Sequence, residues 1–163
     1  MQMMQRDLRI LLHNIRSAHN VGAIFRTSDA IGVSRIYLSG YTPAPVDRFS
    51  RPVGEIAKTA LGAEKVIPWE YAKRPEQFLR RCKKENFTVV GIEQDRRAVD
   101  YKEYRTPKRV VILVGNEVRG ISKSLRDRCD TLIEVPMRGN KESLNVSTAF
   151  GIVMFRLFDD HRA

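Results

Sequence analysis

Three stretches of the sequence place polar side chains beside glycine, each directly after an apolar run. They are residues 14–27 (N-I-R-S-A-H-N-V-G-A-I-F-R-T), 115–121 (G-N-E-V-R-G-I) and 135–145 (V-P-M-R-G-N-K-E-S-L-N). Glycine lets a backbone turn sharply or approach a ligand closely. In open α/β sheets, ligands bind at the carboxyl ends of strands. One such stretch is a weak signal, but three together predict a common site for a small ligand.

The third stretch leads into an apolar helix. Ser143, Leu144 and Asn145 stand at its entrance, where free backbone N–H groups hold an anionic or hydroxyl-bearing ligand easily. The following residues, up to Phe158, are apolar nearly all round. Such a helix must be covered on several sides, and a chain of this size has few elements to do so. We therefore expect a second copy of the chain to supply the missing wall, as a homodimer.

Several other chemistries lack their motifs. The sequence has neither the phosphate-binding G-x-x-x-x-G-K-[ST] pattern nor a G-x-G-x-x-G after the first strand, which argues against P-loop and Rossmann enzymes. It has no G-x-S-x-G hydrolase motif. His13, His19 and His161 do not form a metal-ligand set, so no metal is expected.

The elements that position the three stretches alternate between strands and helices. Strands are predicted at residues 8–12, 35–38, 88–92, 109–114 and 131–135, with a brief one at 66–68. Helices are predicted at 21–31, with Asn20 as N-cap and Gly32 as the stop, and at 55–64, 75–86, 122–128 and beyond Asn145. This order predicts an α/β fold, with a mostly parallel sheet flanked by helices, in one domain spanning residues 1–163.

The charge favours a polyanionic partner. The 163 residues carry a net charge of +10. A field of that size attracts nucleic acid first and an acidic membrane surface second. The long loop at residues 40–54 holds Arg48, Phe49 and Arg51. Arginines beside an aromatic ring suit a nucleic-acid contact, and an ordinary mobile surface loop is an equal alternative.

Cysteine usage and hydropathy indicate a reducing compartment. Cys82 and Cys129 lie far apart without a C-x-x-C pattern, as expected for reduced thiols. The first residues lack the apolar run of a signal peptide, and no stretch approaches the roughly 20 apolar residues of a membrane span. We expect a cytoplasmic protein with no membrane partner.

The three polar stretches also resemble known motifs. Residues 20–33 (N-V-G-A-I-F-R-T-S-D-A-I-G-V), 113–122 (L-V-G-N-E-V-R-G-I-S) and 135–149 (V-P-M-R-G-N-K-E-S-L-N-V-S-T-A) closely resemble the three motifs of the SpoU/TrmH family. These are S-adenosylmethionine-dependent RNA ribose 2′-O-methyltransferases of the SPOUT superfamily. The likeness is weakest between residues 40 and 108. It implies a trefoil knot in the C-terminal third and a homodimer.

The resemblance also implies functional residues. Those matching the family's methyl-donor site are Gly115, Asn116, Glu117, Val135, Met137, Ser143 and Leu144. Those matching its catalytic polar residues are Asn20, Arg26, Glu117, Ser143 and Asn145. Arg26 has the central part in the family pattern, as a base aided by an RNA phosphate. A guanidinium, however, is almost never deprotonated in proteins. Two roles therefore stay open for Arg26: it takes the hydroxyl proton as a base, or it clamps the RNA phosphate.

Each of these polar residues also has an ordinary structural explanation. Asn20 and Ser143 are then helix caps, Glu117 an ion-pair partner of Arg119, Arg26 a solvated charge, and Asn145 a first-turn residue that satisfies a loop carbonyl. Taken with the three motifs, a site role is favoured.

The predicted function is methyl transfer to a ribose 2′-hydroxyl of RNA. With no appended RNA-binding domain in the sequence, we expect a compact substrate such as tRNA, with ribosomal RNA as the alternative. Two other classes stay open: an inactive RNA-binding module of the same fold, and a metabolic enzyme that binds a small anionic substrate. For a metabolic enzyme, we expect the affinity for RNA to be weak and nearly insensitive to salt.

Overall fold

The computed structural model describes residues 6–159 of the chain. In chain order its elements are β1 (Asp7–His13), α1 (Ala18–Ile31), β2 (Arg35–Ser39), α2 (Gly54–Ala60), α3 (Ala63–Val66), β3 (Trp69–Tyr71), α4 (Pro75–Lys84), β4 (Thr88–Ile92), β5 (Val99–Asp100), β6 (Arg109–Val114), α5 (Lys123–Arg126), β7 (Thr131–Glu134) and α6 (Val146–Asp159).

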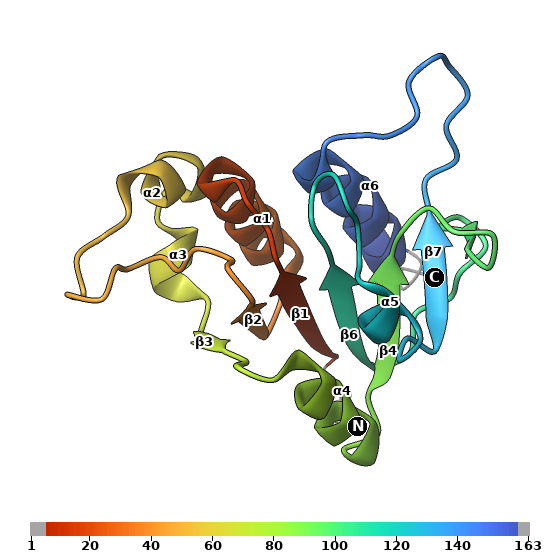
Figure 1. Cartoon of the computed structure of the whole chain (residues 1–163), viewed down its shortest axis with the longest axis horizontal. Coiled ribbons are helices and arrows are strands. Elements are labelled where there is room, and N and C mark those ends of the chain that lie inside the picture. Colours follow the sequence, from red (N-terminus) through yellow and green to blue (C-terminus); the bar gives the residue numbers. More distant parts are fainter. Residues whose placement is uncertain (1–5, 160–163) are drawn as a thin grey trace.

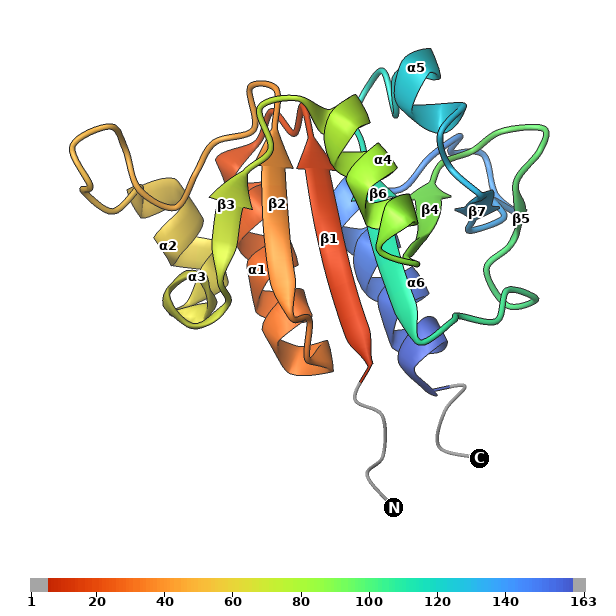
Figure 2. The ribbon, with the colours of Figure 1, turned by 90° about the horizontal axis from the view of Figure 1, so that it is seen from below.

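The strands form one sheet in the order β3-β2-β1-β6-β4-β7-β5, and every strand pairing within it is parallel. The interior strand β1 pairs with β2 on one side and with β6 on the other, with Ile10 opposite both Ile36 and Ile112. All carboxyl ends of the strands therefore lie at one edge of the sheet (Figure 2). The predicted α/β class with its parallel sheet is confirmed.

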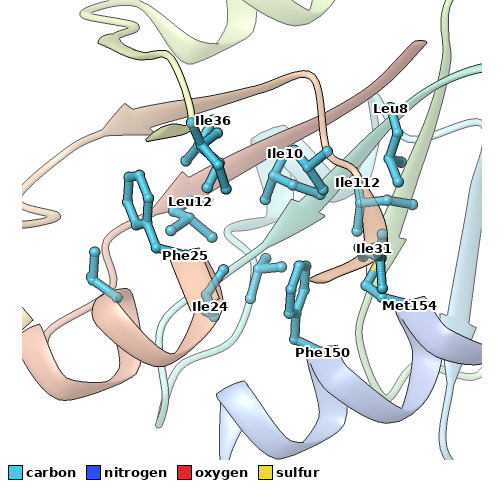
Figure 3. Packing of buried hydrophobic residues seen from close by; sticks show 14 of the residues in the cluster. Leu8, Ile10, Leu12, Ile24, Phe25, Ile31, Ile36, Ile112, Phe150 and Met154 are labelled. Carbon is cyan, nitrogen blue, oxygen red and sulfur yellow. The ribbon is translucent and has the colours of Figure 1, made fainter. Parts of the chain in front are cut away.

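Helices cover both faces of the sheet, because successive strand residues point to opposite sides. Ile10 and Leu12 of β1 belong to a core cluster with α1 and α6, whereas Leu11 belongs to a second cluster with α4. Figures 1 and 2 show α1 and α6 side by side on one face and α4 on the other. In Figure 3 the sheet residues Ile10, Leu12 and Ile112 face side chains of α1 and α6, among them Ile24, Phe25, Phe150 and Met154.

Helix α1 begins earlier than predicted. Its N-cap is Ser17, whose hydroxyl oxygen accepts a hydrogen bond from the backbone N–H of Asn20, and not Asn20 itself. Asn20 lies inside the first turn, with its side chain free for another partner. The end was predicted correctly: Gly32 has φ of 79°, a left-handed conformation that glycine adopts without strain.

Two predictions between residues 55 and 71 were wrong. The single helix at 55–64 is two helices, because Leu61 and Gly62 both take positive φ angles, 50° and 96°, that break the hydrogen-bond ladder. The brief strand is at Trp69–Tyr71 rather than at 66–68. It is the edge strand beside β2, and an edge strand this short leaves little pattern in the sequence.

Cys82 is buried, Cys129 is half-buried, and both are free thiols. Within residues 6–159, no helix is both long and apolar enough to cross a membrane.

Candidate functional site

The three glycine-bearing stretches meet at the carboxyl edge of the sheet, where a pocket opens beside the ends of β4, β6 and β7. About 770 Å³ of space lies between its walls, part of it open to solvent. Its walls are formed by Ile92, Glu93, Gln94, Gly115, Asn116, Glu117, Val118, Gly120, Glu134, Val135, Met137, Ser143, Leu144, Val146 and Ala149.

The loop after β6 is held tightly against itself. Asn116 and Gly120 exchange backbone hydrogen bonds of 3.1 and 2.9 Å. A Cβ atom at position 115 would lie 2.5 Å from the carbonyl carbon of Gly120, so only glycine fits there. Glu93, from the end of β4, accepts a hydrogen bond of 2.6 Å from the backbone N–H of Ile121. These contacts fix the backbone that forms one wall of the pocket.

Glu117 connects this loop to the start of α1. Its carboxylate accepts hydrogen bonds from the backbone N–H groups of Arg16 and Ser17, each 2.9 Å long. It also accepts one of 3.0 Å from the side-chain amide of Asn20. The predicted alternative, an ion pair with Arg119, does not form in this structure. Glu117 therefore joins the first stretch of polar residues to the second.

The environment of Glu117 favours its charged form. Burial by itself raises the pKa of this carboxyl group, but the hydrogen bonds that it accepts, from the backbone of Arg16 and Ser17 and from the Asn20 amide among others, together lower it by more. The pKa of Glu117 therefore lies below its ordinary value. At neutral pH the pocket wall carries a fixed negative charge at this position.

Asn145 connects the third stretch to the other two. Its side-chain amide donates a 3.1 Å hydrogen bond to the side-chain oxygen of Asn20. Its own side-chain oxygen accepts bonds of 2.9 and 3.3 Å from the backbone N–H groups of Ser147 and Thr148, which caps the start of α6. Glu117, Asn20 and Asn145 thus form a continuous polar chain between segments distant in the sequence.

The structure places the predicted site residues in two groups. All seven residues predicted to hold the methyl donor line the pocket: Gly115, Asn116, Glu117, Val135, Met137, Ser143 and Leu144. Of the predicted catalytic residues, Glu117 and Ser143 also line it, and Asn20 and Asn145 are hydrogen-bonded beside it. Arg26 lies apart. Its side chain is exposed on α1 and makes no hydrogen bond or ion pair to any residue between 6 and 159. The roles of all these residues stay predictions.

Sequence reasoning missed the wall formed by the end of β4 and by Glu134. Ile92, Glu93 and Gln94 all line the pocket. Their position directly after an apolar strand was a signal, but it lacked the neighbouring glycine used to select the other stretches. With Glu93, Glu117 and Glu134, three carboxyl groups line the pocket and no Lys or Arg does. Such a wall suits a small molecule that carries positive charge.

A metal ion has no obvious place here. Among the described residues, no three His, Cys, Asp or Glu side chains are grouped so that they hold a metal.

Fold and pocket together define an α/β domain with a small-molecule site at the carboxyl edge of a parallel sheet. The chain belongs to the SpoU rRNA Methylase family, whose sequence pattern matches residues 7–155.

Individual relatives agree with this assignment. The chain is 32% identical to a tRNA (guanosine(18)-2′-O)-methyltransferase of Aquifex aeolicus, over 93% of this chain and 68% of the relative. It is also 32% identical to the 23S rRNA (guanosine-2′-O-)-methyltransferase RlmB of Salmonella typhi, over 92% of this chain and 59% of that one.

A solved structure is similar throughout. The AdoMet-bound rRNA methyltransferase from Sinorhizobium meliloti has a TM-score of 0.84 and 32% identity, over 96% of this chain and 58% of that chain. This chain therefore spans between about three fifths and two thirds of the length of these relatives.

Proposed function

We propose that this protein transfers a methyl group from S-adenosylmethionine to a ribose 2′-hydroxyl of RNA. The observation that carries the proposal is the convergence of three distant segments on one pocket. Gly115 of the second stretch and Val135 and Leu144 of the third line it, and the first stretch is joined to both through the hydrogen bonds of Asn20. The family assignment and the chemistry of relatives in that family support the same reaction.

The pocket fits the methyl donor in charge and in polarity. S-adenosylmethionine carries a sulfonium and an ammonium group, and Glu93, Glu117 and Glu134 supply negative charge around the pocket. Apolar side chains such as Val135 and Leu144 suit its adenine ring. The residues that hold it are Gly115, Asn116, Glu117, Val135, Met137, Ser143 and Leu144. When bound, it supplies an electrophilic methyl group.

The chain's own polar residues act mainly by positioning. An in-line transfer requires the attacking oxygen to be aligned, and alignment alone contributes much of the rate in such reactions. Asn20 and Asn145 are held by the hydrogen bonds described above, beside the pocket mouth. Arg26 is exposed and its side chain has no partner among residues 6–159, so it is available to an RNA phosphate or to the hydroxyl proton. Both roles stay open for Arg26.

The proposal includes a homodimer through α6. Ile152 and Phe155 keep 37% and 46% of their surfaces exposed on this helix, although the opposite side is fully buried. Exposed large apolar side chains on a well-packed helix are typical of a subunit interface. We also retain the trefoil knot in the C-terminal third as a prediction, together with a single domain over residues 1–163.

The substrate is RNA, with tRNA favoured over ribosomal RNA, and the place of action is the cytoplasm. The net charge of +10 supports RNA in general. One of the relatives above is named for tRNA and another for 23S rRNA, which supports either substrate.

The test uses Arg26→Ala with Arg80→Ala as its matched control. Arg80 is also an exposed helical arginine, on α4 at the other face of the sheet. Each protein is incubated with methyl-labelled donor and unmodified bulk RNA. We expect the wild type and Arg80→Ala to label RNA and Arg26→Ala to lose transfer, with unchanged donor affinity by calorimetry. Full activity of Arg26→Ala removes this residue from the mechanism, and no labelling by the wild type contradicts the proposed function.

A further inference from the structure

The segment between β2 and α2 forms an extended loop that lies outside the pocket. Figure 1 shows it projecting from the body of the protein on the side of α2 and α3, and Figure 2 shows it leaving the carboxyl end of β2. Its tip, residues 47–51, holds Arg48, Phe49 and Arg51.

The base of this loop is anchored firmly. The side chain of Thr42 is fully buried, and its hydroxyl group accepts a 3.1 Å hydrogen bond from the backbone N–H of Ile15. The same hydroxyl lies 2.8 Å from the carbonyl oxygen of Ser39, to which it donates. The Tyr41 hydroxyl accepts a 2.9 Å hydrogen bond from the side-chain amide of Asn116. The loop is therefore joined at its base to the wall of the pocket.

The tip is also ordered, as a compact turn around Asp47. The Asp47 carboxylate accepts hydrogen bonds from the backbone N–H groups of Phe49 (2.8 Å) and Arg51 (3.0 Å). It also accepts one of 2.8 Å from the guanidinium group of Arg51. Hydrogen bonds from the Arg51 backbone and side chain lower the pKa of Asp47 below its ordinary value. This geometry fixes the direction of the residues that the turn presents.

The turn presents an aromatic ring between two cations. Phe49 is 62% exposed and belongs to neither core cluster. The guanidinium carbon of Arg48 lies 4.7 Å from the centroid of its ring and that of Arg51 lies 5.0 Å from it. Arg48 forms no ion pair with any residue between 6 and 159. The ring is exposed, adds nothing to the core and is held in a rigid turn. Its position is therefore not explained by a contribution to folding.

We propose that Phe49 is a stacking platform for an unpaired RNA base, with Arg48 and Arg51 binding the adjoining phosphates. An aromatic ring accepts any base on its face, and flanking arginines follow the backbone of a single strand. A protein partner would also cover an apolar ring, but two cations around the ring and a chain charge of +10 favour a polyanion. The inference rests on the proposed function, because it assigns a second contact to the same RNA, away from the reacting ribose.

The experiment compares Phe49→Ala and Phe49→Trp with Val66→Ala, which truncates another exposed apolar residue (69% exposed) on α3. The probes are unmodified tRNA and ribosomal RNA transcripts. We expect Phe49→Ala to weaken RNA binding and raise the KM for RNA on the order of 10-fold, the size of one base–aromatic stack. The effect falls on KM rather than on kcat. Phe49→Trp and Val66→Ala bind like the wild type, and all variants keep the wild-type urea midpoint.

Two further readouts separate stacking from a general loss of affinity. The Trp of Phe49→Trp is quenched when RNA is added, beyond any change in the single native tryptophan, Trp69. Arg48→Gln lowers the slope of log affinity against log salt by about one.

An unchanged KM for RNA in Phe49→Ala overturns the stacking platform, even when the wild type transfers methyl groups. Weaker binding of Phe49→Ala to another protein, with RNA binding unchanged, overturns it in favour of a protein contact. Absence of transfer by the wild type contradicts the proposed function instead, whatever Phe49 does.

Discussion

Glu117 joins parts of the chain that are 101 residues apart in sequence, through its bond with Arg16. Its carboxylate satisfies two backbone N–H groups just before α1 and the buried amide of Asn20. Because these donors are satisfied by its carboxylate, Glu117 contributes both to stability and to the shape of the pocket.

Replacing Glu117 by Gln should destabilise the fold in a pH-dependent way. The carboxylate accepts three hydrogen bonds, and the loss in a partly exposed site is about 1 kcal/mol of unfolding free energy at pH near 7. The folded pKa is depressed, so the stabilisation is fully present above the unfolded pKa and disappears as pH falls through the folded value. The difference in urea unfolding between wild type and variant should therefore be smaller at a pH below the ordinary glutamate pKa of about 4.3 than at pH near 7. Glu142→Gln, in the exposed loop before α6, is the control and should match the wild type at both pH values. A difference that grows on acidification contradicts this account.

Asn145 has two separable functions, and two substitutions distinguish them. Asn145→Asp keeps the oxygen that caps α6 but loses the amide that donates to Asn20. Asn145→Ala loses both. We expect the Ala variant to lose about 1 kcal/mol of stability, the usual cost of a missing N-cap, and the Asp variant to keep its stability. Methyl transfer should fall in both, as measured by initial rates. Normal rates in a stable Asp variant would show that the link to Asn20 is not needed.

At the residue scale, the sequence predicted the pocket better than it predicted the roles around it. Gly115 and Ser143 stand in motifs whose glycines and polar groups mark a close approach to a ligand, and both line the pocket. Glu93 was not predicted as a pocket residue because a single acidic residue after a strand has the same sequence pattern as an ordinary surface charge. Arg26 has no structural partner among the described residues, so neither sequence pattern nor single-chain geometry fixes what it touches.

Helix α6 has one buried side and one side that the single chain leaves partly exposed. One side of it is buried against the sheet and α1, through Phe150, Val153 and Met154. Another side exposes Ile152 and Phe155. The sequence showed that this helix is apolar nearly all round, and the single chain covers only part of it.

Phe155→Glu should convert the proposed homodimer to a monomer. A carboxylate placed in an apolar interface costs several kcal/mol because it loses its hydration without a partner. Light scattering at micromolar concentration measures the change, with Val66→Glu as the control for added charge at an exposed apolar site. A wild type that is already monomeric and active, or a Phe155→Glu variant that stays dimeric, is incompatible with this interface.

Strong local patterns explain which elements were predicted well. The unbroken apolar run of β6 identifies a buried parallel strand, and Gly32 identifies the end of α1. The start of α1 was misplaced because Ser17 and Asn20 are equally good caps by residue type. The break at Leu61 was missed because leucine rarely adopts the positive φ that it takes here.

The whole molecule is strongly basic, and this distinguishes the classes of function that the sequence left open. A polyanion releases counterions when it binds, whereas a small metabolite releases few. The net charge of +10 is therefore relevant to the substrate rather than to the fold.

RNA affinity should fall steeply with salt. With about three phosphates neutralised, a fourfold rise in salt lowers the association constant by roughly 40-fold. Fluorescence anisotropy of a labelled tRNA transcript measures the RNA affinity. The internal control is donor binding by calorimetry in the same buffers, and we expect the donor affinity to change little with salt. Weak RNA binding that is insensitive to salt favours the metabolic-enzyme alternative.

The most direct test of the central claim identifies the atom that receives the methyl group. RNA labelled by the wild-type protein from methyl-labelled S-adenosylmethionine is hydrolysed in alkali, which cleaves only where the ribose 2′-hydroxyl is free. We predict that the label is recovered in alkali-resistant dinucleotides. Label in mononucleotides, which indicates a methylated base, or no label in any tRNA or ribosomal RNA would contradict a pocket built to deliver a methyl group to the ribose.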